Sequence, residues 1–358
     1  MNPSPSRRDW LKNAIGLAPL ALGASLLAPP VRHAAGLSLT PTSPLNALNK
    51  ASGWLNGPPV EPGDLRGKVV LLVVWTYSCV NSLRVLPYLR AWQERYGGRG
   101  LAVIGVHSPE FGFEKDAGNV SRALRELDVG FPVALDSRWR VWEALDNNAW
   151  PAFYFIGADG RVRGRAIGEG GYDRSERLIQ ALLSDVDGRP APDQMTPVVG
   201  LGPEAAPDFA NLRTPETYLG YDKAPAFPGG IHQDERRLYR TAPPMRVGGW
   251  SLTGLWTVGA ESALSAAPGA SIAYRFHARD LHMVLAPAAD GRPARYRIRI
   301  DGEPPGEDHG VDADAAGLGV VTSPRMYQFV RQRRPITDRT FEIEFLDAGA
   351  RAFVFTFG

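Results

Sequence analysis

The feature that most limits how this chain can fold is an unbroken apolar run, KVVLLVVW, from Lys68 to Trp75. After its first residue the run is entirely apolar and largely β-branched, which is typical of a parallel strand buried on both faces of a sheet. Parallel strands need crossover connections, which are usually helices. Helical spacing follows from Leu83 to Tyr96, and Gly97-Gly98 is expected to end that helix. The pattern therefore predicts an α/β unit.

The alternation of strands and helices continues to about residue 184. We predict a second buried strand, a helix capped by Asn119 that runs through Leu127, an antiparallel hairpin and a closing helix. These elements cover residues 101–106, 119–127, 152–156 with 162–167, and 174–183. The order strand-helix-strand-helix-strand-strand-helix, with right-handed crossovers, is that of a thioredoxin fold, which we expect to occupy residues 37–184.

Residues 185–215 differ in composition from both flanks. Prolines interrupt a stretch that is rich in glycine and alanine and has no periodicity. Such a segment is expected to be a linker, semi-rigid because of its prolines.

From residue 216 to residue 358 the pattern changes to short runs in which polar and apolar residues alternate. Turn signals such as Asp290-Gly291 separate the runs, which cover residues 271–276, 281–285, 295–300, 340–345 and 352–357. Half-buried antiparallel strands at this spacing predict an all-β sandwich domain of the jelly-roll type.

Residues 1–36 read as an export signal. Ser6-Arg7-Arg8-Asp9-Trp10-Leu11-Lys12 fits the twin-arginine pattern, and a mild apolar run from Ala14 to Ala28 follows it. That run is shorter than the roughly 20 residues that span a bilayer. We therefore expect export by the twin-arginine pathway to the periplasm or another extracytoplasmic space, with an uncleaved membrane anchor as the alternative.

Charge and cysteine content restrict the function further. The formal net charge is +2, and residues 1–36 carry +3, which leaves about −1 on the remainder, so no nucleic-acid partner is expected. Cys79 is the only cysteine in the sequence. No internal disulfide can form, although an extracytoplasmic compartment would permit one. Any disulfide chemistry must therefore be intermolecular.

Cys79 stands between the predicted strand that ends at Trp75 and the helix that follows. Unpaired N–H groups and the helix dipole favour thiolate over thiol there, and Arg84 adds positive charge about one turn further on. Trp150-Pro151 precedes the hairpin, where a cis proline would expose the Trp150 backbone to an extended partner chain. The alternatives are a structural cysteine and a trans proline in an ordinary loop.

Several segments of both domains carry a resemblance to a known family. Trp75-Thr-Tyr-Ser-Cys-Val-Asn-Ser-Leu-Arg-Val-Leu-Pro87 resembles the W-T-Y-[ST]-C-[IV]-N-C-x-R-x-L-P site of DipZ-type thioredoxin-like proteins, relatives of TlpA. His107-Ser-Pro-Glu-Phe-Gly-Phe-Glu-Lys-Asp116 resembles their H-[ST]-P-E-F-x-F-E-K-D segment. Residues 215–221, 248–258 and 271–358 are similar to that family's second domain. The resemblance covers about Asp64 to Gly358. It implies a redoxin-like thioredoxin domain, a jelly roll similar to carbohydrate-binding modules, and work on thiols outside the membrane.

The sequence departs from the family at the second active-site cysteine, which is Ser82 here. In a two-thiol site the second thiol resolves the mixed disulfide that the first one forms, and a serine hydroxyl cannot do so. Three reactions remain possible for this CxxS site. Cys79 can form a mixed disulfide that an outside thiol or a membrane electron donor resolves, it can shuffle disulfides, or it can be oxidised to a sulfenic acid. Ser82 is expected to support the thiolate by a hydrogen bond.

The resemblance also implies how other residues serve the site. Trp75, Thr76 and Tyr77 are expected to wall it and contact the substrate, and Trp150-Pro151 to dock the partner chain. We predict extracytoplasmic protein thiols or disulfides as partners, with no cofactor and no metal.

Thioredoxins bury an acid behind the site to help move the proton of the second thiol. The matching position here is Val73, and a protein without a second thiol has little need of that acid. Glu110 and Glu114 are the nearest carboxylates in sequence. Glu110 is our candidate to line the site, and a solvated loop carboxylate is the alternative interpretation.

A thiol peroxidase is a second function that the residues leave open. Thr76-Tyr-Ser-Cys79 satisfies the T-x-x-C half of the peroxiredoxin pattern, in which a threonine hydroxyl orients peroxide against the thiolate. The other half fails, because Leu72 stands where the proline should be.

A redox-inactive protein that binds a glycan or a protein through its sandwich is a third function. Trp250, Trp256, Tyr274 and Tyr296 would then supply stacking surfaces, although aromatic residues at strand spacing are more often core. A thiol pKa near the free value of about 8.5 would favour this interpretation.

Metal binding has little support in the sequence. His277 and His282 are five residues apart across a turn, which is not a ligand spacing. Asp308, Asp312 and Asp314 lie in a glycine-containing loop that lacks the EF-hand pattern, so a solvated loop is the better interpretation.

Overall fold

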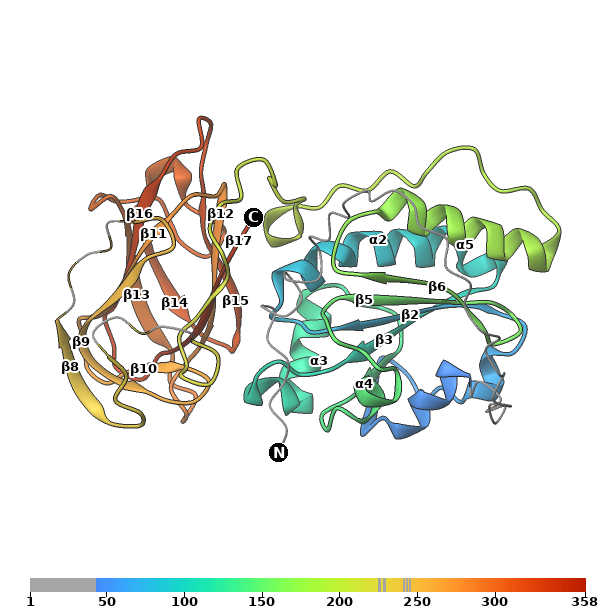
Figure 1. The fold of residues 1–358 in the computed structure, drawn as a ribbon, viewed down its shortest axis with the longest axis horizontal. Coiled ribbons are helices and arrows are strands. Elements are labelled where there is room, and N and C mark those ends of the chain that lie inside the picture. Colours follow the sequence, from blue (N-terminus) through green and yellow to red (C-terminus); the bar gives the residue numbers. More distant parts are fainter. Residues whose placement is uncertain (1–42, 225–226, 228–229, 241, 243, 245) are drawn as a thin grey trace, which may run out of the picture.

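The computed structural model describes residues 43–358, except 225–226, 228–229, 241, 243 and 245, and shows two domains side by side (Figure 1). The predicted export signal lies outside the described residues. The first domain is a sheet covered by helices, and the second is all-β. This confirms the predicted fold class, a thioredoxin-like domain followed by a β-sandwich.

A six-stranded sheet forms the centre of the first domain, in the order β1-β4-β3-β2-β5-β6. The apolar run Lys68 to Trp75 supplies its central strand β2, Val69–Trp75, in which every residue is buried. β2 pairs in parallel with β3 and antiparallel with β5, and β5 forms the predicted hairpin with β6. The other strands are β1 (Gly53–Leu55), β3 (Leu101–His107), β4 (Val133–Leu135), β5 (Ala152–Ile156) and β6 (Val162–Ile167).

Helices cover both faces of this sheet (Figure 1). Side chains of α2, α3 and α5 join the hydrophobic cluster on one face, and side chains of η1 and α4 join the cluster on the other. The α-helices are α2 (Val80–Tyr96), α3 (Ala117–Glu126), α4 (Arg140–Ala144) and α5 (Tyr172–Asp187). The 3-10 helices of this domain are η1 (Pro44–Lys50), η2 (Pro62–Leu65), η3 (Gly97–Arg99) and η4 (Gly112–Lys115).

The start of α3 corrects one sequence prediction. Asp116, not Asn119, is the N-cap residue, and its carboxylate accepts the backbone N–H of Asn119 at 2.8 Å. A carboxylate at this position pairs with a helix N–H and also favours the positive end of the helix dipole. The short elements β4 and α4 were not predicted, because three and five residues are too few to show a period.

Residues 188–216 connect the two domains and contain one short 3-10 helix, η5 (Gly202–Glu204). Arginines on α2 hold this segment along the helix. Arg90 pairs with Glu204 at 2.6 Å, and Arg95 donates to Thr196 Oγ1 at 3.0 Å. The stretch that we predict to be a linker therefore lies against α2 rather than free of it.

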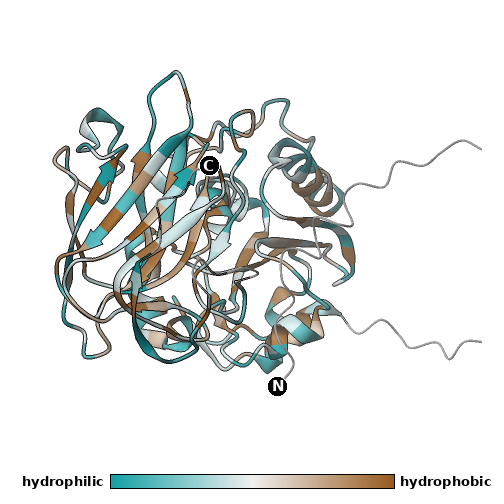
Figure 2. Cartoon of the chain, turned by 60° about the vertical axis from the view of Figure 1, so that its left-hand side comes forward, coloured by the Kyte–Doolittle hydropathy of each residue, from teal (hydrophilic) through white to brown (hydrophobic). Residues whose placement is uncertain are grey.

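The second domain is a single eleven-stranded sheet, and all its strand pairings within the sheet are antiparallel. Rings from strands that are not neighbours in the sheet meet in its interior: Tyr274 of β11 lies 4.7 Å from Phe355 of β17, and Tyr296 of β13 lies 5.1 Å from Phe329 of β15, between ring centroids. The sheet therefore folds over into two layers around one core. Along its strands hydrophobic and hydrophilic residues alternate (Figure 2).

All five strands predicted for this domain are present, and several more were not foreseen. The predicted ones are β11 (Ala270–Phe276), β12 (Asp280–Ala286), β13 (Ala294–Ile300), β16 (Arg339–Phe345) and β17 (Arg351–Phe357). The others are β7 (Thr217–Tyr218), β8 (Arg236–Arg240), β9 (Trp250–Val258), β10 (Ala263–Ser265), β14 (Leu318–Val321) and β15 (Arg325–Arg331), with the 3-10 helix η6 (Gly306–Asp308).

The aromatic residues considered as a glycan-stacking surface belong to the core instead. Trp250 is 8% exposed and Trp256, Tyr274 and Tyr296 are at most 1% exposed. Burial removes each ring from contact with a ligand at the surface. The stacking role is therefore wrong for these four residues.

The two domains share one hydrophobic cluster. Phe111 and Phe113, in the segment after β3, pack on Phe353 of β17 with ring centroids 5.0 and 4.9 Å apart. Val284 of β12 and Met326 of β15 belong to the same cluster as the core residues of the thioredoxin-like domain. Since the carboxyl ends of β2 and β3 point toward the sandwich (Figure 1), the second domain covers the edge where thioredoxin folds carry their active site.

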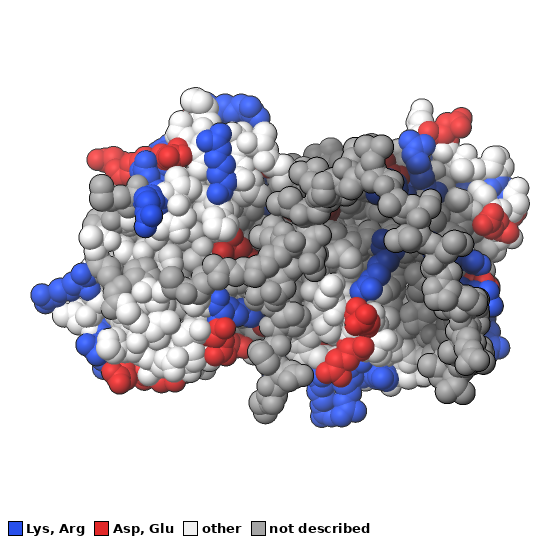
Figure 3. All heavy atoms as spheres, in the orientation of Figure 1, with Lys and Arg blue, Asp and Glu red and all other residues white. Residues whose placement is uncertain are grey.

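Figure 3 shows basic and acidic side chains interspersed over both domains on the face drawn. Within the described residues, none of the helices combines the length and the apolar character that a membrane span requires.

Candidate thiol site at the edge of the thioredoxin-like domain

Cys79 is the N-cap residue of α2, four residues after the end of β2. Its carbonyl accepts the N–H of Leu83 at 3.0 Å, which closes the first turn of the helix. Its side chain is 3% exposed and belongs to the hydrophobic cluster that contains Trp142 and Trp150. The sequence predicts the position at the helix start, but gives no sign that the side chain is covered.

A buried carboxylate, Glu114, holds the loop in front of Cys79. Its Oε1 accepts the hydroxyls of Thr76 at 2.5 Å and Ser78 at 2.6 Å, and also the Ser78 N–H at 3.3 Å. Its Oε2 accepts the backbone N–H groups of Glu110 and Phe111. One side chain thus fixes two of the three residues between β2 and Cys79.

Burial raises the pKa of the Glu114 carboxyl, and the hydrogen bonds from Ser78 and Thr76 act in the opposite direction. Glu110, rather than Glu114, was the acid expected at the site from the sequence. One available signal was missed: Glu114 lies three residues after Phe111, where a helical glutamate commonly reaches back to the N-cap N–H.

His107 lies behind the same loop. Its Nε2 is 3.3 Å from Thr76 Oγ1, and its ring stacks on Tyr77 with centroids 5.5 Å apart. Because the threonine hydroxyl gives its hydrogen to Glu114, Nε2 of His107 is the donor in this pair. Burial lowers the pKa of His107 to about 3, so the ring is neutral at physiological pH.

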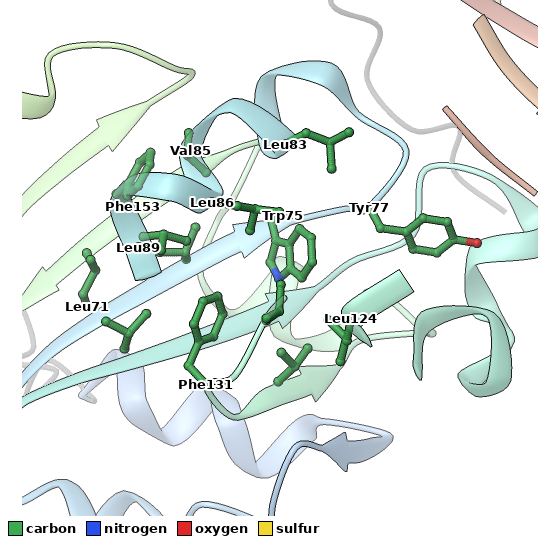
Figure 4. Close-up of a cluster of buried hydrophobic side chains, with 14 of the residues drawn as sticks. Leu71, Trp75, Tyr77, Leu83, Val85, Leu86, Leu89, Leu124, Phe131 and Phe153 are labelled. Carbon is green, nitrogen blue, oxygen red and sulfur yellow. The ribbon is translucent and has the colours of Figure 1, made fainter. Parts of the chain in front are cut away.

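Trp75 points into the cluster between the sheet and α2, whereas Tyr77 points away from the sheet (Figure 4). Trp75 is fully buried and lies edge-on to His107 at 5.8 Å. Tyr77 lies beyond the end of β2 and is 2% exposed, and its hydroxyl has no hydrogen-bond partner in the described part of the chain. Both residues belong to a different hydrophobic cluster from Cys79.

The Trp150–Pro151 peptide bond is cis, which confirms the prediction for this position. The Trp150 indole donates to the carbonyl of Ser108 at 3.0 Å, and its ring lies 4.6 Å from that of Trp142 and 5.4 Å from that of Trp139. Three tryptophans thus gather on the face of the sheet that carries Cys79. The docking role of Trp150-Pro151 stays a prediction.

Ser82 is completely buried one turn into α2. Its hydroxyl oxygen accepts the backbone N–H of Thr76 at 3.4 Å. The side chain therefore ties the helix to the end of β2, and its hydroxyl hydrogen stays available to a neighbour. Support of a Cys79 thiolate by that hydrogen is still a prediction.

Arg84 is buried and directed toward the second domain. Its Nη1 pairs with Glu169 Oε1 at 2.9 Å, and its Nη2 lies 3.5 Å from the carbonyl oxygen of Phe357. At about 100° per residue, Arg84 is roughly 140° around the helix from Cys79. Stabilisation of the thiolate by the charge of Arg84 therefore stays a prediction. The contacts of Arg84 in the structure join the two domains.

Glu110, the acid expected to line the site, contacts the second domain. Its carboxylate accepts the Tyr218 hydroxyl at 2.6 Å and pairs with Lys223 at 3.2 Å. Residues 107–116 are thus divided between two tasks: Glu114 supports the thiol loop, and Glu110, Phe111 and Phe113 contact the sandwich.

The acidic side chains of the loop considered for calcium binding pair with other groups of the protein. Asp312 pairs with Arg325, and Asp308 accepts the backbone N–H of Arg333 at 2.8 Å. In the described ranges, three or more His, Cys, Asp or Glu side chains nowhere come together in a way that could hold a metal ion.

The sheet order, the buried central strand and a cysteine at the start of the following helix define a thioredoxin-like protein. Family comparisons agree: the Redoxin family matches residues 47–178, and the family described as "Thioredoxin like C-terminal domain" matches residues 214–358. Together they place both domains in the DipZ/TlpA-like thioredoxin-like family, to which this chain belongs.

Individual proteins are similar to part or most of this chain. Protein DipZ of Mycobacterium bovis and of Mycobacterium tuberculosis are each 35% identical over 315 residues, which is 87% of this chain and 42% of the relative. The chain therefore spans less than half the length of these DipZ proteins. Thiol-disulfide oxidoreductase YkuV of Bacillus subtilis is 25% identical over 144 residues, covering 40% of this chain and 97% of YkuV. A solved thioredoxin-like protein in its oxidised form is 27% identical over 38% of the chain, with a TM-score of 0.36.

Proposed function

We propose that this chain is a thiol–disulfide oxidoreductase that acts through a single nucleophile, Cys79. The observation that carries the proposal is the position of Cys79 as the N-cap residue of α2 in a thioredoxin-like domain. The first N–H groups of a helix have no partner within the helix, and with the dipole they favour a thiolate. Relatives with the names DipZ and thiol-disulfide oxidoreductase support the same chemistry.

The proposed step is one thiol–disulfide exchange. The Cys79 thiolate attacks one sulfur of a partner disulfide, a bond forms between the two sulfurs, and the other partner sulfur leaves as a thiolate. An outside thiol then attacks the mixed disulfide and releases Cys79, because Ser82 has no sulfur with which to do so. The product is the partner joined to the resolving thiol, and no net electrons stay on this chain.

The low exposure of Cys79, at 3%, adds a requirement to this step. The surface around the sulfur must open locally before a macromolecule reaches it. A small alkylating reagent should therefore react much faster with Cys79 than a bulky one does.

The decisive experiment is the capture of a partner disulfide by the full chain. We expect the wild type to form a mixed disulfide with a peptide activated as its thionitrobenzoate disulfide, and Cys79→Ala to release no thionitrobenzoate. Ser82→Cys should add turnover in insulin reduction with dithiothreitol, since it supplies the resolving thiol. Insulin reduction by the wild type at thioredoxin-like rates would contradict the role assigned to Ser82.

The thiol peroxidase alternative has less support in the geometry. Thr76 would have to direct its hydroxyl hydrogen at a peroxide bound to Cys79, but that hydrogen goes to Glu114 at 2.5 Å. Hydrogen peroxide consumption by the purified protein with dithiothreitol tests this alternative.

We further propose that the protein works in the periplasm or another extracytoplasmic space, with protein thiols or disulfides and an outside resolving thiol or membrane electron donor as partners. The twin-arginine pattern of residues 1–36 supports this location. The proposed domain bounds are 37–184 and 216–358, joined by 185–215, and the second domain is proposed to be a jelly roll. Secretion of a fusion of residues 1–36 that fails without Arg7 and Arg8 would test the pathway.

A further inference from the structure

A cleft of about 540 Å³ lies between the two domains, beside the loop that leads to Cys79. Its walls come from α2, the end of α3, the connecting segment and the start of β15. Apolar side chains form much of its surface, among them Leu83, Leu127 and Met326. A cavity of this size falls in the range that binds small ligands or a few residues of a peptide.

The charges of the cleft do not cancel. Arg90 is paired with Glu204 at 2.6 Å, and Arg325 is paired with Asp312. Glu126 also lines the cleft, and within the described residues its carboxylate has neither an ion pair nor a hydrogen bond. Asp128, close to it in the chain and in the same lining, is likewise without a side-chain partner in the part of the chain that the structure describes.

The end of α3 adds to this negative character. Glu126 is the last residue of that helix, where the helix dipole places partial negative charge. Two carboxylates and a helix C-terminus therefore face an opening in which Arg90 and Arg325 each pair with another carboxylate. Two positive charges act against them: Arg325 also feels Glu126, and Arg122 lies close enough to Tyr77 to lower its pKa. A positively charged group on an apolar stem complements this surface.

A buried hydroxyl supplies a second and independent sign of a ligand. Tyr77 lines the cleft, is 2% exposed and has no hydrogen-bond partner for its hydroxyl in the described part of the chain. A buried polar group without a partner costs free energy, which a ligand that pairs with it would recover. Burial raises the pKa of Tyr77, so the hydroxyl stays protonated, and its oxygen can accept an N–H from a cation that displaces the atoms covering it.

We propose that this cleft binds a lysine or arginine side chain of the partner polypeptide whose sulfur reacts with Cys79. The cation lies between Glu126 and Asp128, its stem packs on the apolar wall, and the Tyr77 hydroxyl accepts one of its N–H groups. This inference rests on the proposed function, because it takes the disulfide partner of Cys79 as the occupant.

The short separation between Tyr77 and Cys79 in the chain is compatible with a peptide partner. Tyr77 precedes Cys79 by two residues, and two or three residues of an extended partner span roughly 7–10 Å. A basic residue two or three positions from the partner's cysteine is therefore within reach of the cleft when that cysteine meets Cys79. The site thus gives the thiol a charge preference that Cys79 alone does not have.

The test uses the full chain and two peptides that each carry one cysteine as its thionitrobenzoate disulfide. One peptide has lysines two and three residues from the cysteine, and the other has glutamates there. At low salt we expect thionitrobenzoate release to be about fivefold faster with the lysine peptide, the worth of one exposed ion pair of about 1 kcal/mol. Glu126→Gln and Asp128→Asn should each reduce the preference. Glu94→Gln, the same change at an exposed position near the far end of α2, should leave it intact.

The outcomes separate this inference from the proposed function. Equal release rates for both peptides would overturn the cleft as a charge-selective site and leave exchange at Cys79 standing. No release from either peptide would overturn the proposed function. In that case, peptides with serine in place of cysteine test the cleft by calorimetry: tighter binding of the lysine form, weakened severalfold by Glu126→Gln and by Tyr77→Phe, supports it, and equal binding overturns it. Full competition by butylamine would overturn the peptide as occupant in favour of a small amine.

Discussion

The two faces of the thioredoxin-like sheet serve different purposes. On one face the hydrophobic cluster stays within the domain and contains Cys79, Trp142 and Trp150. On the other face the cluster continues across the domain boundary to Phe353 and its neighbours in the sandwich. Alternate residues of β2 belong to the two clusters, and so do Tyr77 and Cys79 in the loop that follows it. Neighbouring residues therefore support the thiol and the second domain in turn. The difference indicates that the sandwich is attached by ordinary core packing, while the thiol loop is held by polar contacts to Glu114.

The largest expected effect comes from breaking the shared cluster. Phe353→Ala removes a buried ring that packs on Phe111 and Phe113, so we expect a loss of about 3–5 kcal/mol in the free energy of unfolding. Urea unfolding followed by tryptophan fluorescence measures it. Phe341→Ala, inside the sandwich, is the matched control: it should cost a similar amount without making residues 188–216 more sensitive to protease. Equal protease sensitivity in both variants would contradict a continuous core.

Removing the buried carboxylate should have the next largest effect. Glu114→Gln keeps the shape of the side chain but replaces one of two acceptor oxygens by an NH₂, which must face either the N–H groups of Glu110 and Phe111 or the N–H of Ser78, at a cost of about 2–3 kcal/mol. The capture rate of Cys79 should fall as well, because the loop loses its anchor. Glu176→Gln removes a carboxylate that Tyr96 and Thr196 use, and should lower stability without slowing capture. Similar capture by both variants would argue against a positioning role for Glu114.

Lowering the pH should destabilise both domains, because each contains one buried histidine. Burial lowers the pKa of His107 and of His282 to about 3, below the value near 6.5 of an unfolded chain. Between pH 6.5 and 3 the unfolded chain binds more protons, so stability falls as the pH falls through this window. At pH 5 each histidine should account for about 2 kcal/mol of lost stability. Urea unfolding at pH 7 and pH 5 tests this: His282→Leu should lose less than the wild type, and an identical loss would refute the assignment.

The smallest expected effect concerns the arginine contacts of the connecting segment. Arg90 and Glu204 are partly exposed, so Arg90→Gln should lower stability by about 1 kcal/mol or less. High salt should reduce the difference from the wild type, because partly exposed pairs are screened. A loss of several kcal/mol would mean that the segment carries more of the domain contact than the shared core does.

The sequence predicts the fold well where apolar patterns are long. β2 and the hairpin of β5 and β6 are present at the residues where the patterns place them, and so are the five predicted strands of the sandwich. Short elements were missed, since β4 and α4 have too few residues for a period. The strands β9 and β15 were also missed.

The site was predicted less completely than the fold. The placement of Cys79 at a helix start follows from local pattern, which is why it could be read from the sequence. The role of Glu114 depends on a contact with Thr76, 38 residues away in sequence, and spacing does not disclose which of two nearby glutamates makes it. Arg84 was expected to face the thiol but its visible partners are Glu169 and Phe357, because the packing of the second domain determines where its side chain lies.

The rings of Phe111 and Phe113 have a practical consequence for anyone who divides this protein. A fragment that ends at residue 187 would place two phenylalanines, normally covered by Phe353, in water on the rim next to the reactive sulfur. Such a fragment would tend to self-associate, and its thiol reactivity would then describe aggregated material rather than the intact protein.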